Sequence, residues 1–182
     1  MTRLSQAIAE GDGISVLVAV RDAAAAGTAE GQGADGLVLT HGAGGVRDAS
    51  QLPLLFLGAA REARLADADA VVVPAEIAPW DEARALGLEC VVRVEDGEDV
   101  ERALEELDPE IFLLSVEPST SEDVLEALLE LLQDVPAGKL AIAELHDATA
   151  AEVAELERAG IDAVLVTAQD VAALVPAEPP DV

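Results

Sequence analysis

Charged and polar residues stand at the ends of several short apolar runs in this chain, where parallel strands would bring them together. Arg21 and Arg93 can present forked N–H donors to a carboxylate or a phosphate, and Glu144 can pair with either arginine. His146 and Thr167 follow the last two runs and add further polar groups. The full candidate ring consists of Arg21, Thr40, His41, Glu76, Arg93, Glu95, Ser115, Glu117, Glu144, His146, Thr167 and Gln169.

Two interpretations of the arginines remain open. In the first, Arg21 and Arg93 form an ion network with Glu144 that fills the site, because an unpaired buried charge costs several kcal/mol. In the second, a small anionic molecule binds to Arg21, Arg93, Glu144, His146 and Thr167. The presence of two arginines in a chain with so few cations is the motive for the second interpretation.

The pattern gives less support to catalysis or metal binding. Glu144 is a candidate acid or base, with Glu117 as a partner, but carboxylates are abundant throughout the chain. His41, Glu144 and His146 are residue types that bind zinc or iron, yet the two histidines lie far apart in the sequence. We therefore predict no metal site and no cofactor, and the catalytic residues stay unknown.

Composition restricts the classes of partner. The 182 residues carry a formal net charge of −27, from 37 acidic and 10 basic residues. Such a surface repels phosphate backbones and anionic lipid, so we predict no nucleic-acid partner and no membrane partner. Cys90 is the only cysteine, which excludes a disulfide framework, and no apolar run approaches the ~20 residues of a membrane span. We expect a cytoplasmic protein.

The elements that must position the candidate ring are best defined between Lys139 and Asp170. Thr149 and Glu152 have the spacing of a capping box, and Gly160 stands where a helix C-cap is expected. The next run is rich in β-branched residues and is typical of a buried parallel strand. Apolar runs predict strands at Ile14–Val20, Leu37–Thr40, Leu54–Leu57, Ala70–Val73, Cys90–Val94, Ile111–Leu114, Leu140–Ala143 and Ala163–Val166.

Helical patterns fill most intervals between these strands. The first two intervals hold little helix, because Ala23–Ala26 is followed by glycines and the segment from His41 to Gln51 is itself glycine-rich. We therefore expect shortened helices there, a thinly covered flank near strands 1 to 3, and a homodimer formed through that flank. The other predicted helices are Ala59–Leu65, Pro79–Leu86, Asp99–Leu107, Ser121–Leu132 with a capping box at Ser119 and Glu122, and Ala150–Ala159.

A short pattern repeats before three of the strands. Each copy of the pattern has a small or apolar residue, then an aspartate, then a small residue, followed by three apolar residues. The copies are separated by intervals close to multiples of roughly 30 residues. Such repetition indicates one β-α unit used along the whole chain. The three copies begin with Ala34-Asp35-Gly36, Ala68-Asp69-Ala70 and Ile161-Asp162-Ala163.

Eight β-α units with apolar strands predict a compact TIM (β/α)8 barrel, shorter than the ~250 residues typical of that fold. An open doubly wound sheet is less favoured, because no glycine-rich nucleotide-binding turn follows a strand. We expect a single domain over residues 1–175, followed by a disordered, proline-rich acidic tail at 176–182.

Three segments in the second half of the chain resemble the indole-3-glycerol-phosphate synthase family of phosphate-binding barrels. They are ALGLECVVRVEDGEDVERALE, PEIFLLS and LAIAELHDATAAEVAELERAGIDAVLV. The resemblance implies a (β/α)8 barrel with its site at the C-terminal ends of the strands. It also implies an activity, the decarboxylating ring closure of an anthranilate-linked phosphorylated sugar.

Most residues that the family uses for this reaction are replaced here. The resemblance places the first-strand glutamate at Ala19, a lysine at Arg21, the third-strand lysine near Leu57 and the fifth-strand glutamate at Arg93, and only Glu144 keeps its type. The segments directly after the last two strands, where the family binds phosphate, contain no glycine, since none stands between Gly138 and Gly160 or after Gly160. We expect a shortened, inactive or repurposed barrel, a pseudoenzyme without the synthase activity. A functional lyase or synthase acting on a phosphorylated sugar is the alternative.

Overall fold

Eight parallel strands form a closed barrel in the computed structural model, which describes residues 4–11, 13–42, 44–116, 124–167 and 170–174. Each strand pairs with the next in chain order, and β8 pairs with β1 to close the ring. The predicted fold class is confirmed. The strands are β1 (Ser15–Ala19), β2 (Gly36–Leu39), β3 (Leu54–Leu57), β4 (Ala70–Pro74), β5 (Glu89–Val94), β6 (Ile111–Leu114), β7 (Leu140–Glu144) and β8 (Ala163–Val166).

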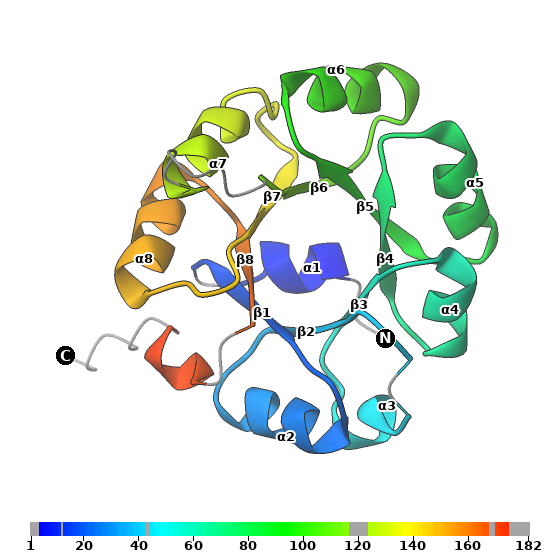
Figure 1. Ribbon diagram of the computed structural model, residues 1–182, viewed down its shortest axis with the longest axis vertical. Helices are drawn as coiled ribbons and strands as arrows, with labels where there is room; N and C mark the ends of the chain where they lie inside the picture. Colours follow the sequence, from blue (N-terminus) through cyan, green and yellow to red (C-terminus); the bar gives the residue numbers. More distant parts are fainter. Residues whose placement is uncertain (1–3, 12, 43, 117–123, 168–169, 175–182) are drawn as a thin grey trace.

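Helices surround the barrel, and one further helix, α1, lies within the ring (Figure 1). No helix in the described part of the chain is both long enough and apolar enough to span a bilayer. The helices are α1 (Leu4–Ala9), α2 (Ala23–Gly31), α3 (Val46–Ala49), α4 (Ala60–Leu65), α5 (Ile77–Ala85), α6 (Gly97–Glu106), α7 (Val124–Leu132), α8 (Ala150–Ala159) and the 3-10 helix η1 (Val171–Ala173).

The capping signals around α8 are confirmed. The Thr149 side chain accepts a hydrogen bond from the Glu152 N–H, and the Glu152 carboxylate accepts one from the Thr149 N–H at 2.7 Å. Gly160 ends the helix with a φ of 98°, which glycine adopts without steric cost. The second predicted capping box, Ser119 with Glu122, and the predicted tail at 176–182 lie outside the described residues.

The second crossover is short, as predicted, but the first is not. Helix α3 has 4 residues, whereas α2 has 9, as many as α5 and α7. Asp22 explains the difference, because its side chain accepts a hydrogen bond from the Ala25 N–H and so caps the start of an alanine-rich segment. That cap and four consecutive alanines outweigh the cost of Gly27 within the helix.

The flank over β1, β2 and β3 is covered despite the short α3. Leu37, Leu39 and Phe56 on this side are at most 1% exposed. Arg47 fastens α3 to the barrel by donating to the Leu52 carbonyl at 3.0 Å and to the Asp69 carboxylate at 2.7 Å. The expectation of a thinly covered flank is therefore wrong, and the homodimer stays a prediction without that support.

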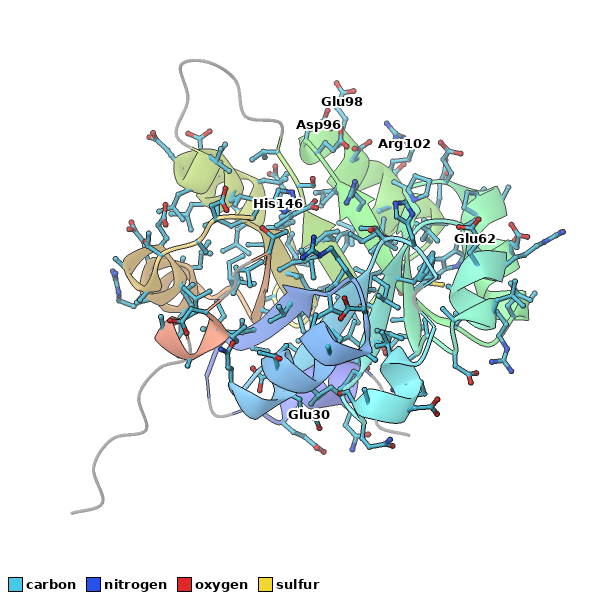
Figure 2. All side chains as sticks on the ribbon, turned by 60° about the horizontal axis from the view of Figure 1, so that its bottom comes forward. Glu30, Glu62, Asp96, Glu98, Arg102 and His146 are labelled. Atoms are coloured by element: carbon cyan, nitrogen blue, oxygen red, sulfur yellow. The ribbon has the colours of Figure 1, made fainter. Side chains whose placement is uncertain are left out.

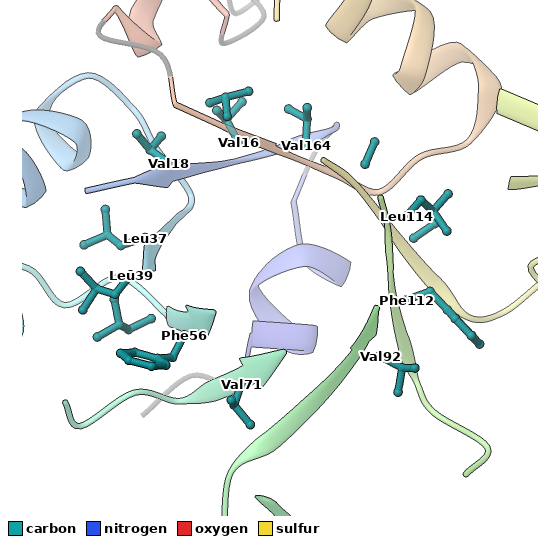
Figure 3. Packing of buried hydrophobic residues seen from close by; sticks show 14 of the residues in the cluster. Val16, Val18, Leu37, Leu39, Phe56, Val71, Val92, Phe112, Leu114 and Val164 are labelled. Carbon is teal, nitrogen blue, oxygen red and sulfur yellow. The ribbon is translucent and has the colours of Figure 1, made fainter. Parts of the chain in front are cut away.

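The barrel interior is built from layers of side chains contributed by alternate strands, as in other TIM barrels. Valines, leucines and isoleucines dominate the middle layers and are buried. Residues of opposite parity point away from the axis toward the outer helices, as Figure 3 shows for Val16, Leu37 and Phe56. From the C-terminal end downward, strand register gives the layers Ala19/Leu57/Arg93/Glu144, Val38/Val72/Leu113/Leu165, Leu17/Leu55/Val91/Ile142 and Gly36/Ala70/Ile111/Ala163.

The repeated aspartates connect neighbouring strands at the N-terminal end of the barrel. Asp35 donates its N–H to the Val16 carbonyl and accepts the Val16 N–H on its carboxylate at 2.8 Å. Asp69 forms the same reciprocal pair with Leu54, and Asp162 forms it with Ala141. Partial burial raises the pKa of Asp35, and the hydrogen bond from Val16 opposes this shift. The repeat is thus a structural device for strand pairing.

The small residue after each aspartate makes room for α1. Gly36 and Ala70 lie in the innermost layer at this end, and a Cβ on Gly36 would approach Leu17 Cδ2 to 2.7 Å. Leu4 and Ile8 of α1 fill the hollow and are 0% and 4% exposed. The Ser5 N–H and hydroxyl both donate to the Glu89 carboxylate on β5. Helix α1 therefore closes the end of the barrel opposite the predicted site.

The packing of α1 predicts a stability difference between two leucine variants. Leu4→Ala should lower the free energy of unfolding by about 2–5 kcal/mol, because it leaves a cavity beneath the barrel. Leu65→Ala is the matched control, since Leu65 on α4 is 88% exposed, and its effect should stay within about 0.5 kcal/mol. Urea denaturation followed by circular dichroism measures both. Equal effects of the two substitutions would contradict the buried position of α1.

Candidate functional site

Arg93 and Glu144 face each other in the outermost layer of the barrel interior, at the C-terminal ends of β5 and β7. Arg93 Nη2 lies 3.1 Å from Glu144 Oε2 and 3.4 Å from Oε1. The Glu144 side chain is only 9% exposed, whereas that of Arg93 is 34% exposed. A carboxylate so removed from water requires a cation, and Arg93 supplies it. This ion pair is the chemical centre of the barrel mouth.

Arg93 keeps hydrogen-bonding capacity beyond its contact with Glu144. Its Nε is buried and has no hydrogen-bond partner among the described residues. Only Nη2 of its guanidinium reaches the carboxylate. A buried donor without a partner is costly unless a water or a ligand accepts from it. Because the side chain is also partly exposed, an oxygen-bearing ligand entering from solvent can accept from Arg93 without displacing Glu144.

His146 lies beside this pair and Thr167 contacts His146, and both side chains are exposed. His146 Nε2 is 3.6 Å from Glu144 Oε1, and its side chain is 60% exposed. The Thr167 hydroxyl donates to the His146 carbonyl at 2.8 Å, so it joins the loops that follow β7 and β8. Arg21 is different, because it is exposed after β1 and forms no ion pair within the described residues. The structure therefore does not bring Arg21 into the Arg93–Glu144 pair.

The remaining ring residues occupy varied positions. Thr40 and His41 are exposed after β2, and Ser115 is half-buried after β6. Glu117 and Gln169 lie outside the described residues. The described residues contain no group of three or more His, Cys, Asp or Glu side chains suited to a metal ion, and this covers His41, Glu144 and His146.

A cavity of about 590 Å³ opens at the mouth, between the loops that follow β3, β4 and β5. Its apolar wall includes Leu57, Val72 and Pro74, and Arg93 is also among the lining residues. Arg102 and Asp99 of α6 also line it and form an ion pair at 2.7 Å. Figure 2 shows Arg102 and Glu98 on α6, with Asp96 directly before the helix. The volume falls in the range of small-molecule sites.

Arg102, Asp99 and the apolar wall were not among the residues predicted from the sequence. Arg102 lies one helical turn after Asp99, a spacing that places both on one face of α6. The sequence did contain a signal for Asp99 and Arg102. They lie near the start of the helix that follows β5, and the N-terminus of such a helix in a TIM barrel lies at the mouth. Nothing in the sequence alone shows that Leu57 and Val72 remain partly uncovered.

The described part of the mouth holds no lysine, and one donor of the usual phosphate cradle is bonded within the protein. Lys139, the single lysine of the chain, precedes β7 at the opposite end of the barrel and pairs with Asp108 at 2.6 Å. In many TIM barrels a short helix after β8 offers its first N–H groups to phosphate. Here the Val171 N–H of η1 donates instead to Gln32 Oε1 at 3.1 Å. One donor of such a cradle is therefore already occupied by the protein.

Comparison with known sequences gives a partial match. No protein-family model matches the chain. Over 84 residues it is 38% identical to the indole-3-glycerol phosphate synthase of Variovorax paradoxus and 36% identical to that of Acidovorax sp.. Part of this chain is similar to indole-3-glycerol phosphate synthases. The matched part is 46% of this chain, and it spans about a third, 32%, of the length of these relatives.

Solved structures support the fold. The N-acetylmannosamine-6-phosphate 2-epimerase of Clostridium perfringens superposes with a TM-score of 0.69 at 16% identity, covering 84% of this chain and 85% of the epimerase. Thiamine phosphate pyrophosphorylase of Pyrococcus furiosus superposes with a TM-score of 0.67 at 17% identity, covering 88% and 93%. The native KDPGal structure superposes with a TM-score of 0.65 at 15% identity, covering 87% of this chain and 92% of the KDPGal chain. At these identities the likeness concerns the barrel alone.

The position of Cys90 separates the only thiol from the site. Cys90 lies near the N-terminal end of β5 and is 8% exposed. It lines a different cavity, of about 920 Å³, formed by loops that lead into β4, β5 and β6. Burial raises the pKa of the Cys90 thiol to about 11, with Arg84 lowering it and Glu89 raising it to smaller extents. The reactive thiolate is therefore scarce at neutral pH.

The Arg93–Glu144 pair predicts non-additive effects on stability. Arg93→Met should cost about 2 kcal/mol, because it leaves Glu144 nearly buried without its guanidinium partner. The double variant Arg93→Met/Glu144→Met should be more stable than the single Arg93→Met variant, since neither charge then remains unpaired. A double-mutant cycle in urea denaturation measures the coupling. Strictly additive effects would show that the pair does not form in solution.

Burial of Cys90 predicts slow alkylation in the folded protein. At pH 8 the thiol with a pKa of about 11 should react with iodoacetamide at least about 100-fold more slowly than in urea, because both thiolate and access are limited. Mass spectrometry of quenched samples measures the rate. Fast modification of the folded chain would mean that the thiol is exposed and ionised.

Proposed function

We propose that this protein is a repurposed barrel that binds a small carboxylate-bearing molecule at its mouth and does not perform the synthase reaction. The observation that carries the proposal is Arg93, which lines the mouth cavity, is 34% exposed and contacts Glu144 through Nη2 alone. A ligand carboxylate would accept from the guanidinium N–H groups that Glu144 does not use, and it would lie against Leu57 and Val72. The barrel would then act in binding, sensing or transport of that molecule.

The charges of the mouth argue against the synthase reaction. Where the resemblance expects acidic and lysine side chains, the outermost layer holds Ala19, Leu57 and Arg93, with Glu144 already paired. A lysine can donate a proton and act as a general acid, whereas an arginine stays protonated and cannot. Lys139 lies at the other end of the barrel and cannot replace it. The alternative, a working synthase, rests on the partial sequence similarity.

Direct binding and turnover measurements test the proposal. Isothermal titration of the wild-type protein with butanoate should give measurable binding, weakened at least about tenfold in Arg93→Met, in line with the loss of a charge-assisted bond. Arg158→Met is the matched control, because Arg158 is exposed on α8, and it should bind as the wild type does. No indole-3-glycerol phosphate should form from the anthranilate-linked phosphorylated sugar.

Two outcomes would overturn this assignment. Formation of indole-3-glycerol phosphate by the purified protein would establish the alternative. Absence of heat with butanoate and with inorganic phosphate, together with a stability loss as the only effect of Arg93→Met, would leave the ion pair as a purely structural feature. Circular dichroism of each variant confirms that it is folded before binding is compared.

A further inference from the structure

The carboxylates around the mouth cavity outnumber the guanidiniums. Arg93 is matched by Glu144, and Arg102 is matched by Asp99. Two more acidic residues line the same cavity, Glu76 at the start of α5 and Glu95 after β5. Both are exposed, and neither side chain forms a hydrogen bond or an ion pair with another described residue. After pairing, the lining therefore keeps two uncompensated negative charges.

This imbalance limits what can bind beside Arg93. A ligand that carries only negative charge would gain a contact with one guanidinium and be repelled by Glu76 and Glu95 across the same cavity. A phosphate dianion would be repelled more strongly than a carboxylate. Glu62 adds to the repulsion, because it lies next to Gly58, which also lines the cavity. Its Oε2 is 3.7 Å from the position that a Cβ on Gly58 would occupy. The electrostatics of the cavity disfavour a simple anion.

A ligand with both charges resolves the imbalance. Its carboxylate would accept from Arg93, and its ammonium group would donate to Glu76 or Glu95. The apolar wall of Leu57, Val72 and Pro74 lies in the same cavity and suits an aliphatic segment between the two charged groups. Charges of both signs and an apolar surface thus occur together within one volume of about 590 Å³.

We infer that the mouth cavity selects a small aliphatic amino acid, a molecule with one carboxylate and one ammonium group, over phosphates and simple carboxylates. In this assignment Arg93 binds the carboxylate, and Glu76 and Glu95 are the residues that determine specificity through the ammonium group. The inference rests on the proposed function, because it places the ligand carboxylate on Arg93. It adds the chemical class of the ligand and two residues that recognise it.

A set of probes matched in carbon skeleton tests the assignment. Isothermal titration compares the amino carboxylates glycine, 3-aminopropanoate, 4-aminobutanoate and 5-aminopentanoate with butanoate, butylammonium and inorganic phosphate. The best amino carboxylate should bind at least about tenfold more tightly than butanoate, and phosphate should bind most weakly, because only the first class satisfies both charges. The graded chain length locates the distance between the two recognition points.

Variants separate the two recognition points. Glu76→Gln/Glu95→Gln should weaken the best amino carboxylate at least about fivefold and leave butanoate unchanged or bound more tightly, because the repulsion is removed. Arg93→Met should weaken both ligands. Glu101→Gln is the matched control, since Glu101 is exposed on α6 and does not line the cavity. It should bind every probe as the wild type does.

The outcomes distinguish this inference from the proposed function. If butanoate binds through Arg93 as tightly as every amino carboxylate, or if the double glutamine variant binds all probes unchanged, the amino-acid assignment is wrong while the proposed function stands. If phosphate binds most tightly, the assignment is also wrong. If no carboxylate binds in a manner that depends on Arg93, both are wrong.

Discussion

Every inward side chain of this barrel must share a narrow axis with those of other strands, and this packing constraint determines both ends of the molecule. In the middle layers, valine, leucine and isoleucine fill the space. At the N-terminal end, Gly36, Ala70 and Ala163 leave a hollow that α1 occupies. At the opposite end the axis meets solvent, and the last layer of the interior holds the ion pair of Arg93 and Glu144. The site is thus the last layer of the core.

The net charge of the chain makes Arg93 unusual. With 37 acidic residues and 10 basic ones, most carboxylates are on the surface and solvated. Glu144 is not, because its strand position places it beneath the mouth at 9% exposure. A nearly buried Glu144 carboxylate requires a cation, and its ion pair with Arg93 keeps that side chain at the barrel mouth. Because a guanidinium has five N–H donors, Arg93 has donors that do not contact Glu144. A structural requirement for charge balance therefore accounts for a partly exposed arginine at the mouth.

The sequence was informative wherever a local pattern has one physical solution. Continuous apolar runs form the barrel strands, and the Thr149–Glu152 spacing produces the capping box of α8. Helix α1 was not predicted, because it has 6 residues and is stabilised by Leu4 and Ile8 in the barrel axis rather than by its own propensity. The exposed position of Arg21 and the mouth cavity were not predicted for a related reason. Both depend on the course of loops, which no periodicity in the sequence describes.

The two ends of the barrel are encoded differently, and this bears on how a scaffold can keep its shape while its site changes. The N-terminal end depends on a repeated aspartate that binds the backbone of the previous strand, so any loss there disturbs strand pairing. The mouth layer depends only on a balance of charge and volume among four positions. Arg93 opposite Glu144, with Ala19 and Leu57 completing the layer, gives a net charge of zero without a lysine. Arginine on β5 and an apolar residue on β3 are therefore electrostatically compatible with Glu144 on β7 in a single layer of the barrel.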